Sequence, residues 1–170
     1  PDALGGNKNT VISFKIGITM LSNPNSEYES LLERAIAIAA KAHEGQVDKA
    51  GYPYLAHPLF VMENVNSLQE KIVAVLHDAV EDSELTFDEL RSAGFPEVIV
   101  LAIAAITKIE GEADAAYLER VIGNAIALRV KIADVTHNLD IRRIANPTEA
   151  DFQRIAKYKK VLSQLRGALK

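Results

Sequence analysis

The sequence predicts an all-α fold, a compact bundle of about seven to nine helices joined by short loops. Three observations lead to this expectation. From Ser26 onward, apolar residues recur at helical spacing almost throughout. Gly and Pro residues interrupt that pattern where helices are expected to end and begin. The length of 170 residues, with 48% hydrophobic and 25% charged positions, suits one globular domain.

The amino-terminal segment differs from the rest of the chain. Residues 1–25 begin with a polar, Gly-rich stretch, and we expect them to form a leader or extension outside the fold, with Met20 a candidate for the natural start. Residues 26–170 are expected to form the domain. Ser26 and Glu29 have the spacing of a capping box, which predicts that the first helix begins at Ser26.

Glycines and prolines place the remaining elements. The segment 45–56 is the one clear loop in the middle of the chain. Pro58 suits the first turn of a helix over residues 57–68, with His57 at its N-cap, and Gly94 suits the end of a later helix. Further helices are expected over residues 71–82, 86–94, 96–108, 114–124, 125–144 and 148–170.

Composition excludes several classes of function. The chain has no cysteine, so a metal site would have to use His, Asp or Glu, and the absence of disulfides suits the cytoplasm. With a net charge of -4, the chain lacks the broad basic surface that DNA or RNA binding requires. No apolar run is long enough for a membrane span. We therefore expect a small-molecule ligand, while composition leaves the oligomeric state open.

The segment LHDAVED carries the densest chemistry. On a helix, His77, Asp78, Glu81 and Asp82 would share one face opposite an apolar face, with no Lys or Arg between His77 and Asp82. A solvated acidic face is the simpler interpretation. Such faces usually mix charge signs, however, and crowded carboxylates repel unless a cation neutralises them. A metal or catalytic role is therefore favoured.

Asp134 is the second indication of a site, because it lies in the very apolar run AIALRVKIADV. A buried carboxylate is costly unless it is paired or binds a metal. Asn138 lies four residues on, on the same helix face. An ion pair with Lys131, Arg142 or Arg143 is the alternative explanation for Asp134, and the sequence leaves it open.

Two of the four histidines join these carboxylates as candidate ligands. His57 follows the Gly- and Pro-containing loop, although capping or packing would also explain it. His43 and His137 are expected to be structural or to support the site. The resulting set of nitrogen and oxygen donors suits Mn²⁺, Fe²⁺, Zn²⁺ or Mg²⁺ and metal-assisted hydrolysis of a phosphate ester or anhydride, with the two acids of the ED pair orienting and deprotonating water. The candidate ligands are His57, His77, Asp78 and Asp134.

These motifs resemble the HD-type hydrolase domain of the RelA/SpoT alarmone enzymes. The length is similar to the small hydrolase-only members, which include the animal homologue Mesh. The resemblance covers roughly residues 28–165. The matching segments are HP at 57–58, HD at 77–78 followed by AVED, KIADVTHNL at 131–139, AITK at 105–108, and AAKAHEGQVDKAGYPYLAHPL.

The resemblance implies a Mn²⁺-dependent hydrolase that releases pyrophosphate from the 3′ position of a hyperphosphorylated purine nucleotide such as (p)ppGpp. The family's metal ligands fall on the four residues derived above, and its catalytic pair falls on Glu81 and Asp82. The family's substrate contacts fall on Lys49, Lys108, Asn138, Arg154 and Tyr158.

Three departures from the family concern specificity. The family usually has arginines where this chain has Asp48, Val135 and Asp140, and the first of them stacks on the nucleobase. Its loss makes the adenine analogue (p)ppApp a candidate substrate. Two alternatives are another HD-type nucleotide phosphohydrolase, which YLAHP and RIAKY argue against, and a catalytically silent alarmone-binding module, which Glu81 and Asp82 argue against.

Overall fold

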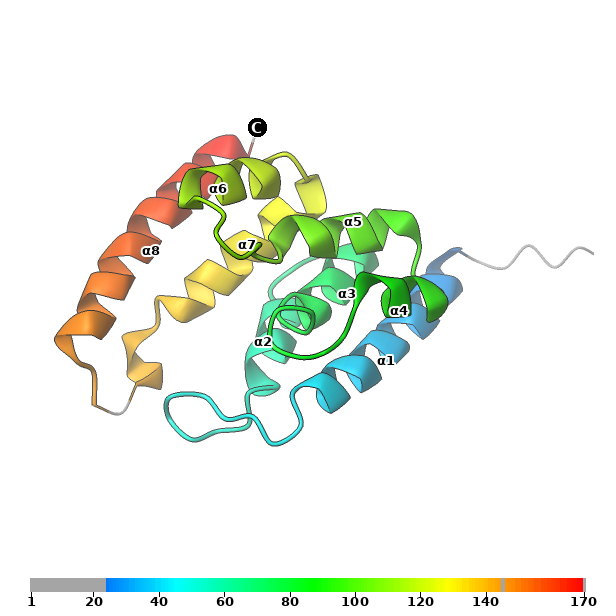
Figure 1. Cartoon of the computed structure of the whole chain (residues 1–170), viewed down its shortest axis with the longest axis horizontal. Helices are drawn as coiled ribbons and strands as arrows, with labels where there is room; N and C mark the ends of the chain where they lie inside the picture. The colour runs from blue at the N-terminus through cyan, green and yellow to red at the C-terminus, as the bar shows by residue number, and fades with distance from the viewer. Residues whose placement is uncertain (1–23, 145, 170) are drawn as a thin grey trace, which may run out of the picture.

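A computed structural model of the chain describes residues 24–144 and 146–169. In these two ranges the expected all-α fold is confirmed, with eight α-helices and a short 3₁₀-helix, η1 (Figure 1). None of the helices in these ranges is long and apolar enough to cross a membrane. The elements are α1 Pro24–Ala42, α2 Ala56–Glu63, α3 Leu68–Leu76, α4 Phe87–Ser92, α5 Glu97–Ile106, α6 Asp114–Ile122, α7 Ala125–Asn138, η1 Ile141–Arg143 and α8 Glu149–Ala168.

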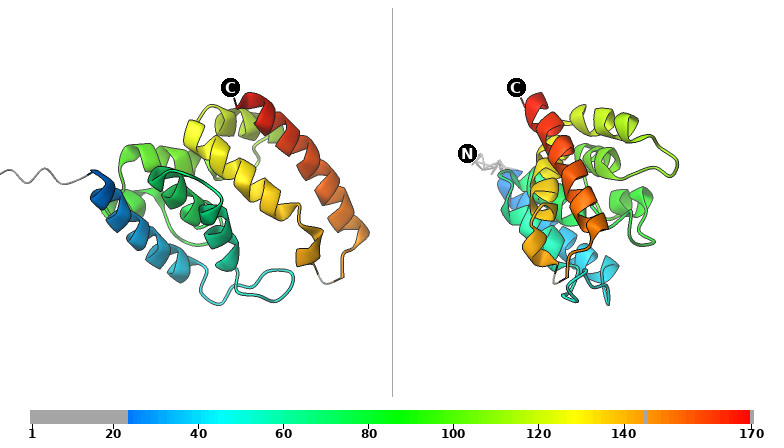
Figure 2. Two further views of the ribbon diagram at one scale, coloured as in Figure 1. Left: turned by 180° about the vertical axis from the view of Figure 1, so that it is seen from behind. Right: turned by 90° about the vertical axis from the view of Figure 1, so that its left-hand side faces the viewer.

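Helix α7 is the central element of the bundle. It contacts α2, α3, α5, α6 and α8, whereas α1 packs mainly on α3. The two views of Figure 2 show α7 between the long α8 and the group formed by α2 and α3. A residue on α7 therefore reaches both halves of the molecule, which is the position a site between them requires.

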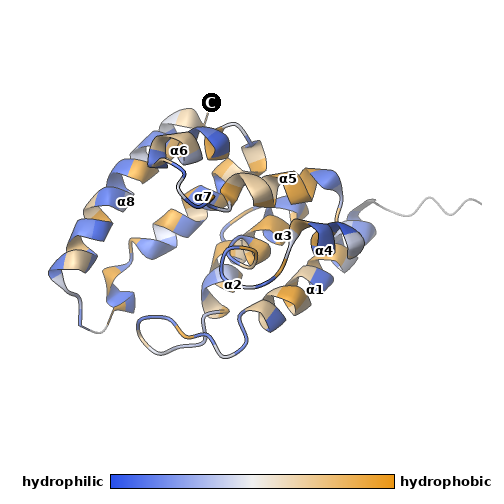
Figure 3. Ribbon diagram, in the orientation of Figure 1, coloured by the Kyte–Doolittle hydropathy of each residue, from blue (hydrophilic) through white to orange (hydrophobic). Residues whose placement is uncertain are grey.

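Two apolar clusters hold the fold together. The larger cluster contains residues of the first five helices and of one side of α7. The smaller cluster contains residues of α6, α8 and the other side of α7. Helix α5 is apolar on most of its surface and α8 is largely polar, as Figure 3 shows. Leu165 is the fully buried anchor of α8 in the smaller cluster. Burial of one such leucine stabilises the fold by about 1.5–3 kcal/mol.

Local sequence signals explain several helix boundaries. Thr86 caps α4 through a capping box with Glu89, whose backbone N–H donates to the Thr86 hydroxyl. Gly94 follows α4 with φ 88°, a left-handed conformation that glycine adopts without strain. The predicted helix end at Gly94 is therefore confirmed.

Other predicted boundaries are wrong. Pro24, the first described residue, is already part of helix α1, so Ser26 lies inside the helix and not at its N-cap. Helix α2 begins at Ala56, so His57 lies in its first turn beside Pro58, and Leu55 occupies the N-cap position. The N-cap therefore lies two residues earlier than the position predicted from Pro58. Of the expected leader, residues 1–23 lie outside the described ranges.

The long helix expected over residues 57–68 also ends early. Helix α2 stops at Glu63, and α3 begins at Leu68 after a capping box between Ser67 and Glu70. Glu70 accepts the backbone N–H groups of Asn66 and Ser67. This cap starts a helix three residues before the one predicted from residue 71.

Candidate metal and hydrolytic site

The HD motif lies in a turn and not, as predicted, on a helix. Helix α3 ends at Leu76, residues 77–81 form consecutive turns, and Asp82 lies in the bend that follows. Three carboxylates without a basic neighbour are unfavourable at a helix C-terminus, where the macrodipole is negative. The helix therefore ends before Asp78. The shared helix face predicted for this motif is wrong, and contacts with distant segments position its side chains instead.

His77 turns a free nitrogen toward two carboxylates. Its Nδ1 donates to the Ala74 carbonyl oxygen at 2.7 Å, so Nε2 carries the lone pair whenever the ring is neutral. This buried Nε2 makes no hydrogen bond, although it lies 3.1 Å from Asp78 Oδ2 and 3.8 Å from Asp134 Oδ1. Burial alone lowers the pKa of His77, but Asp78 and Asp134 raise it to about 10. The two carboxylates therefore attract a positive charge to this point.

His57 presents its Nε2 to the same two carboxylates. Nε2 lies 3.2 Å from Asp134 Oδ1 and 3.6 Å from Asp78 Oδ2. On the other side of the ring, Nδ1 lies 2.7 Å from Nδ1 of His137, which stacks on Phe60. His137 therefore orients His57, in agreement with the supporting role expected for it.

Asp134 is held on α7 by its own helical neighbours. Its Oδ2 pairs with Lys131 Nζ at 2.8 Å, and its Oδ1 accepts a hydrogen bond from Asn138 Nδ2. The ion pair with Lys131 that the sequence left open is therefore present. It does not exclude a ligand role, because Oδ1 also faces His57 and His77.

The residues at this centre fit a divalent cation. His57, His77 and Asp78 offer donor atoms that all lie within 4.8 Å of one another. Nε2 of His77 faces carboxylate oxygens, which are acceptors only, so either a proton on Nε2 or a cation bound between them satisfies these atoms together. Two imidazoles and carboxylate oxygens suit Mn²⁺, Fe²⁺ or Zn²⁺, whereas Mg²⁺ prefers oxygen ligands.

Two further acids follow this centre in the turn. Glu81 Oε2 accepts the backbone N–H of Lys108 at 3.1 Å, which ties the turn to the end of α5. Asp82 is exposed toward the pocket, yet partial desolvation together with Asp78 and Glu81 raises the pKa of its carboxyl. An acid with a raised pKa next to a cation centre is suited to proton transfer.

The loop before α2 positions both Asp78 and Asp82. The Tyr54 hydroxyl donates a hydrogen bond to Asp78 Oδ2 at 2.6 Å. Gln46 Nε2 donates to the Asp82 carbonyl oxygen at 2.9 Å, and Gln46 Oε1 lies 2.9 Å from His43 Nδ1. His43 therefore has the structural role expected for it. Sequence reasoning missed Tyr54 and Gln46, because their partners are distant in the chain.

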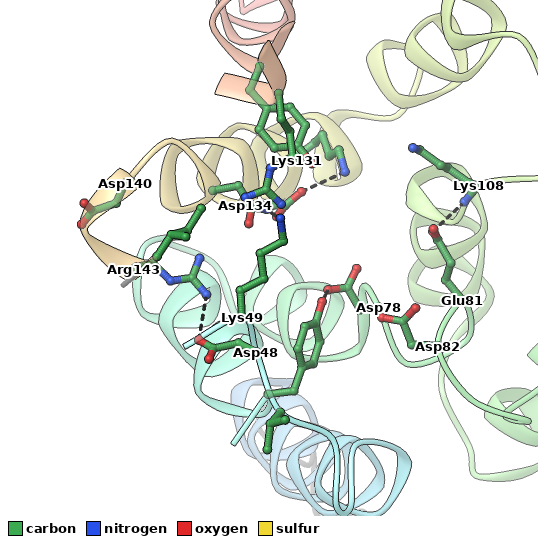
Figure 4. Close-up of a pocket in the computed structure, with 16 residues that line it drawn as sticks. Asp48, Lys49, Asp78, Glu81, Asp82, Lys108, Lys131, Asp134, Asp140 and Arg143 are labelled. Atoms are coloured by element: carbon green, nitrogen blue, oxygen red, sulfur yellow. Dashed lines mark hydrogen bonds and ion pairs between the residues drawn. The ribbon is translucent and has the colours of Figure 1, made fainter. Parts of the chain in front are cut away.

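A pocket of about 400 Å³ opens over this centre. In Figure 4, Glu81, Asp82 and Lys108 lie at one end of it and Asp48 and Arg143 at the other. Five basic and six acidic side chains line it, so a polyanion needs additional positive charge to bind. The basic residues are Lys49, Lys108, Lys131, Arg143 and Arg154.

All five expected substrate contacts line this pocket, but several already have partners. Lys49 Nζ pairs with Asp151 Oδ1 at 2.5 Å, and Arg154 lies 3.8 Å from the same oxygen. Asp151, which the sequence analysis missed, thus orients two cations. Tyr158 lies beneath the Arg154 guanidinium at 5.9 Å. The other two are Lys108, which lies over the Tyr117 ring, and Asn138.

Comparisons with known proteins agree with this architecture. The chain is 33% identical over 150 residues to a GTP pyrophosphokinase of Streptomyces coelicolor, covering 79% of the chain and 18% of that protein. It is 28% identical over 123 residues to the bifunctional (p)ppGpp synthase/hydrolase SpoT of Escherichia coli, covering 64% of the chain and 17% of that protein. The aligned region thus spans less than one fifth of these relatives. No protein-family model matches the chain.

One solved structure resembles the fold over most of its length. It is that of a metazoan orthologue of SpoT that hydrolyses ppGpp. The TM-score is 0.68 at 24% identity, over 82% of this chain and 87% of that one. The similarity shows that the helical bundle described here is the fold of that hydrolase.

Proposed function

The chain belongs to the RelA/SpoT-type HD-domain proteins, and from this premise we propose that it hydrolyses the 3′-pyrophosphate of (p)ppGpp. In this reaction water attacks the phosphorus that is bonded to the ribose 3′-oxygen. Cleavage of the bond between the ribose 3′-oxygen and phosphorus then releases pyrophosphate, and the 3′-hydroxyl takes up a proton. The proposal covers the described domain and not the larger relatives.

One observation supports this proposal more than any other. The unpaired Nε2 of His77 lies between Asp78 and Asp134, directly beside the turn that contains Glu81 and Asp82. A module that only binds nucleotide has no need of two further carboxylates at this point, because they would repel its phosphates. The arrangement suits a site that binds a cation and transfers protons.

We propose Mn²⁺ as the cation, held by His57, His77, Asp78 and Asp134. When bound, such an ion supplies Lewis acidity toward a phosphate oxygen and lowers the pKa of water. The chain's own contribution is to fix these donors. His137 orients His57, and Ala74 orients His77 through its carbonyl oxygen.

Glu81 and Asp82 carry the proton transfer in this proposal. The raised pKa of Asp82 makes its carboxylate a better acceptor for a proton from the attacking water. Glu81 is anchored by the Lys108 backbone N–H and orients that water from the other side. Gln46 fixes the backbone of Asp82, so the base stays in one position.

Basic residues around the pocket bind the phosphates. Lys49 and Arg154 would exchange their shared partner Asp151 for phosphate oxygens, which offer stronger charge-assisted hydrogen bonds. Lys108 lies at the Glu81 end, where it can neutralise the departing pyrophosphate. Tyr158 packs against the ribose. Asn138, whose amide nitrogen is used by Asp134, can contribute only its remaining groups.

The adenine nucleotide (p)ppApp is the second substrate to be tested, because Asp48 stands where the family has a stacking arginine. Another HD-type nucleotide phosphohydrolase would release orthophosphate or a nucleoside monophosphate. A silent binding module would release nothing. The cytoplasmic location and the absence of nucleic-acid or membrane partners stay predictions.

Product analysis separates these possibilities. Purified protein is incubated with ppGpp or ppApp, with and without Mn²⁺, and pyrophosphate and orthophosphate are quantified. We expect pyrophosphate, and only with the metal. Asp82→Asn and Glu81→Gln should each lower kcat about 10²–10⁴-fold, as is typical for loss of a general base.

The matched control is Asp88→Asn, which alters an exposed carboxylate on α4 that pairs with Arg91. It should keep full activity, and circular dichroism should show that all three variants stay folded. Orthophosphate as the product, or an Asp82→Asn variant as active as the unaltered protein, would refute the proposed function.

A further inference from the structure

The two ends of the pocket differ in chemistry. The Glu81 end is polar, whereas the Asp48 end contains the aliphatic side chains of the pocket lining, Val47 and Ile144. Val47 is 62% exposed, so its side chain is accessible to a ligand in the pocket. Arg143 adds a planar guanidinium at the same end (Figure 4). Aliphatic groups and a guanidinium plane are what the faces of a nucleobase contact.

Asp48 is fixed at this end by its own loop. Its Oδ1 accepts the backbone N–H groups of Ala50 at 2.9 Å and Tyr52 at 3.0 Å. Arg143 Nη2 lies 3.7 Å from the other oxygen, Oδ2, which is too far for a hydrogen bond. Asp48 therefore presents one oriented carboxylate oxygen whose lone pairs remain available in the pocket.

The available oxygen distinguishes the two purines. A carboxylate is only an acceptor. The Watson–Crick edge of guanine offers two donors, N1–H and the N2 amine, whereas adenine offers its N6 amine beside the lone pair of N1. Against Asp48 Oδ2, guanine can donate from both N1–H and the N2 amine, whereas adenine can donate only from its N6 amine and brings the N1 lone pair close to the carboxylate.

We propose that Asp48 reads the Watson–Crick edge of the base and makes this hydrolase selective for guanine over adenine. The inference rests on the proposed function and reverses the preference suggested by the sequence, where loss of an arginine at this position pointed to adenine. Arg143 then contributes in two ways, since its positive charge lies 3.7 Å from Asp48 Oδ2 and its guanidinium plane can contact the base.

The size of the effect follows from exposure. A fully buried polar site rejects an analogue that lacks the matching group by about 10⁴–10⁵-fold. The Asp48 side chain is 18% exposed and its rim is open to water, so part of the penalty is relieved. We expect a preference in kcat/KM of about 10–100-fold for ppGpp over ppApp. The inosine analogue, which lacks the N2 amine, should fall between them.

The test compares these three nucleotides on the unaltered protein and on Asp48→Asn. Asparagine keeps an oxygen for the N–H groups of Ala50 and Tyr52 but turns an amide donor toward the base. The ratio of kcat/KM for ppGpp to that for ppApp should fall at least ten-fold. Asp88→Asn is the control, because Asp88 is an exposed carboxylate on α4 that pairs with Arg91 and does not line the pocket, and it should leave the ratio unchanged.

Equal turnover of the two nucleotides by the unaltered protein, or an unchanged ratio in Asp48→Asn, would overturn the inference. If neither nucleotide is hydrolysed, the proposed function is refuted, and the role of Asp48 in base recognition is tested separately. Calorimetric binding of GDP and ADP then decides the role of Asp48: tighter GDP binding that is lost in Asp48→Asn supports base reading, and equal binding refutes it.

Discussion

The two sides of the candidate metal centre are built in different ways. On the α7 side, Asp134 is fixed by residues one turn away, Lys131 and Asn138, in a regular helix. On the turn side, Asp78 and Asp82 follow the end of α3, and distant residues such as Tyr54 hold them. The helix side is locally self-sufficient, whereas the turn side depends on tertiary contacts.

This difference has consequences for energy and function. A carboxylate paired with a mostly buried ammonium contributes to stability, because removal of either partner leaves an uncompensated charge. Carboxylates crowded in a turn repel one another, so they cost stability and gain reactivity. We therefore expect substitutions on the α7 side to affect folding first, and those on the turn side to affect catalysis first.

The largest expected effect tests the helix side. Asp134→Ala should lower the free energy of unfolding by about 3 kcal/mol, because Lys131 stays mostly buried without its carboxylate. Asp78→Ala should cost less, about 1–2 kcal/mol, since it removes the Tyr54 hydrogen bond and the ion pair with His77, which holds the pKa of Asp78 below its usual range, but also relieves repulsion from Asp134. Urea unfolding in EDTA measures both values without any contribution from bound metal.

The second substitution Lys131→Met, added to Asp134→Ala, is the control for this prediction. It removes the unpaired ammonium and should recover at least half of the lost stability. If Asp134→Ala and Asp78→Ala prove equally destabilising, or if Lys131→Met gives no recovery, the two sides do not differ as proposed.

A smaller effect tests the turn side. Gln46→Ala removes the hydrogen bond to the Asp82 carbonyl oxygen and leaves both acids of the turn in place. A displacement of the base by about 1 Å can cost up to 10²-fold in rate. We expect kcat for ppGpp to fall about 10–100-fold, with a loss of stability near 1 kcal/mol.

Gln69→Ala provides the matched comparison. Gln69 also makes a side-chain hydrogen bond, to the Tyr28 hydroxyl at 3.0 Å, but between α3 and α1 and away from the pocket. The two variants should lose similar stability, and only Gln46→Ala should lose kcat. Equal kcat values for the two variants would show that the turn needs no support from the loop.

The same division explains how much of the site the sequence could predict. Asp134, Lys131 and Asn138 are neighbours by helical spacing, so their proximity follows from the order of residues alone. The HD turn was predicted as a helix because its apolar residues have helical spacing. What ends α3 is the unfavourable placement of acids at a helix C-terminus, together with contacts from Gln46 and Tyr54 that no local pattern encodes.

The smallest expected effect is on stability: Asp82→Asn should raise the free energy of unfolding, whereas the substitutions above lower it. Because Asp78 and Glu81, with partial desolvation, raise the pKa of Asp82, the folded protein retains this proton at a pH where the unfolded chain has lost it. Its ionisation therefore costs stability, and the cost is absent at low pH and grows as pH rises through the folded-state pKa. Asparagine cannot ionise, so the variant escapes this cost.

In EDTA at about pH 7, Asp82→Asn should thus be more stable than the unaltered protein by a few tenths of a kcal/mol, a modest gain because solvent screens this exposed carboxyl. The gain should shrink toward about pH 3, below the ordinary Asp pKa of 3.8, where the carboxyl is mostly protonated in the folded and in the unfolded protein. Parallel urea unfolding series at the two pH values measure it. A variant that is less stable at neutral pH would mean that Asp82 is held by a favourable partner, and the turn would then resemble the α7 side.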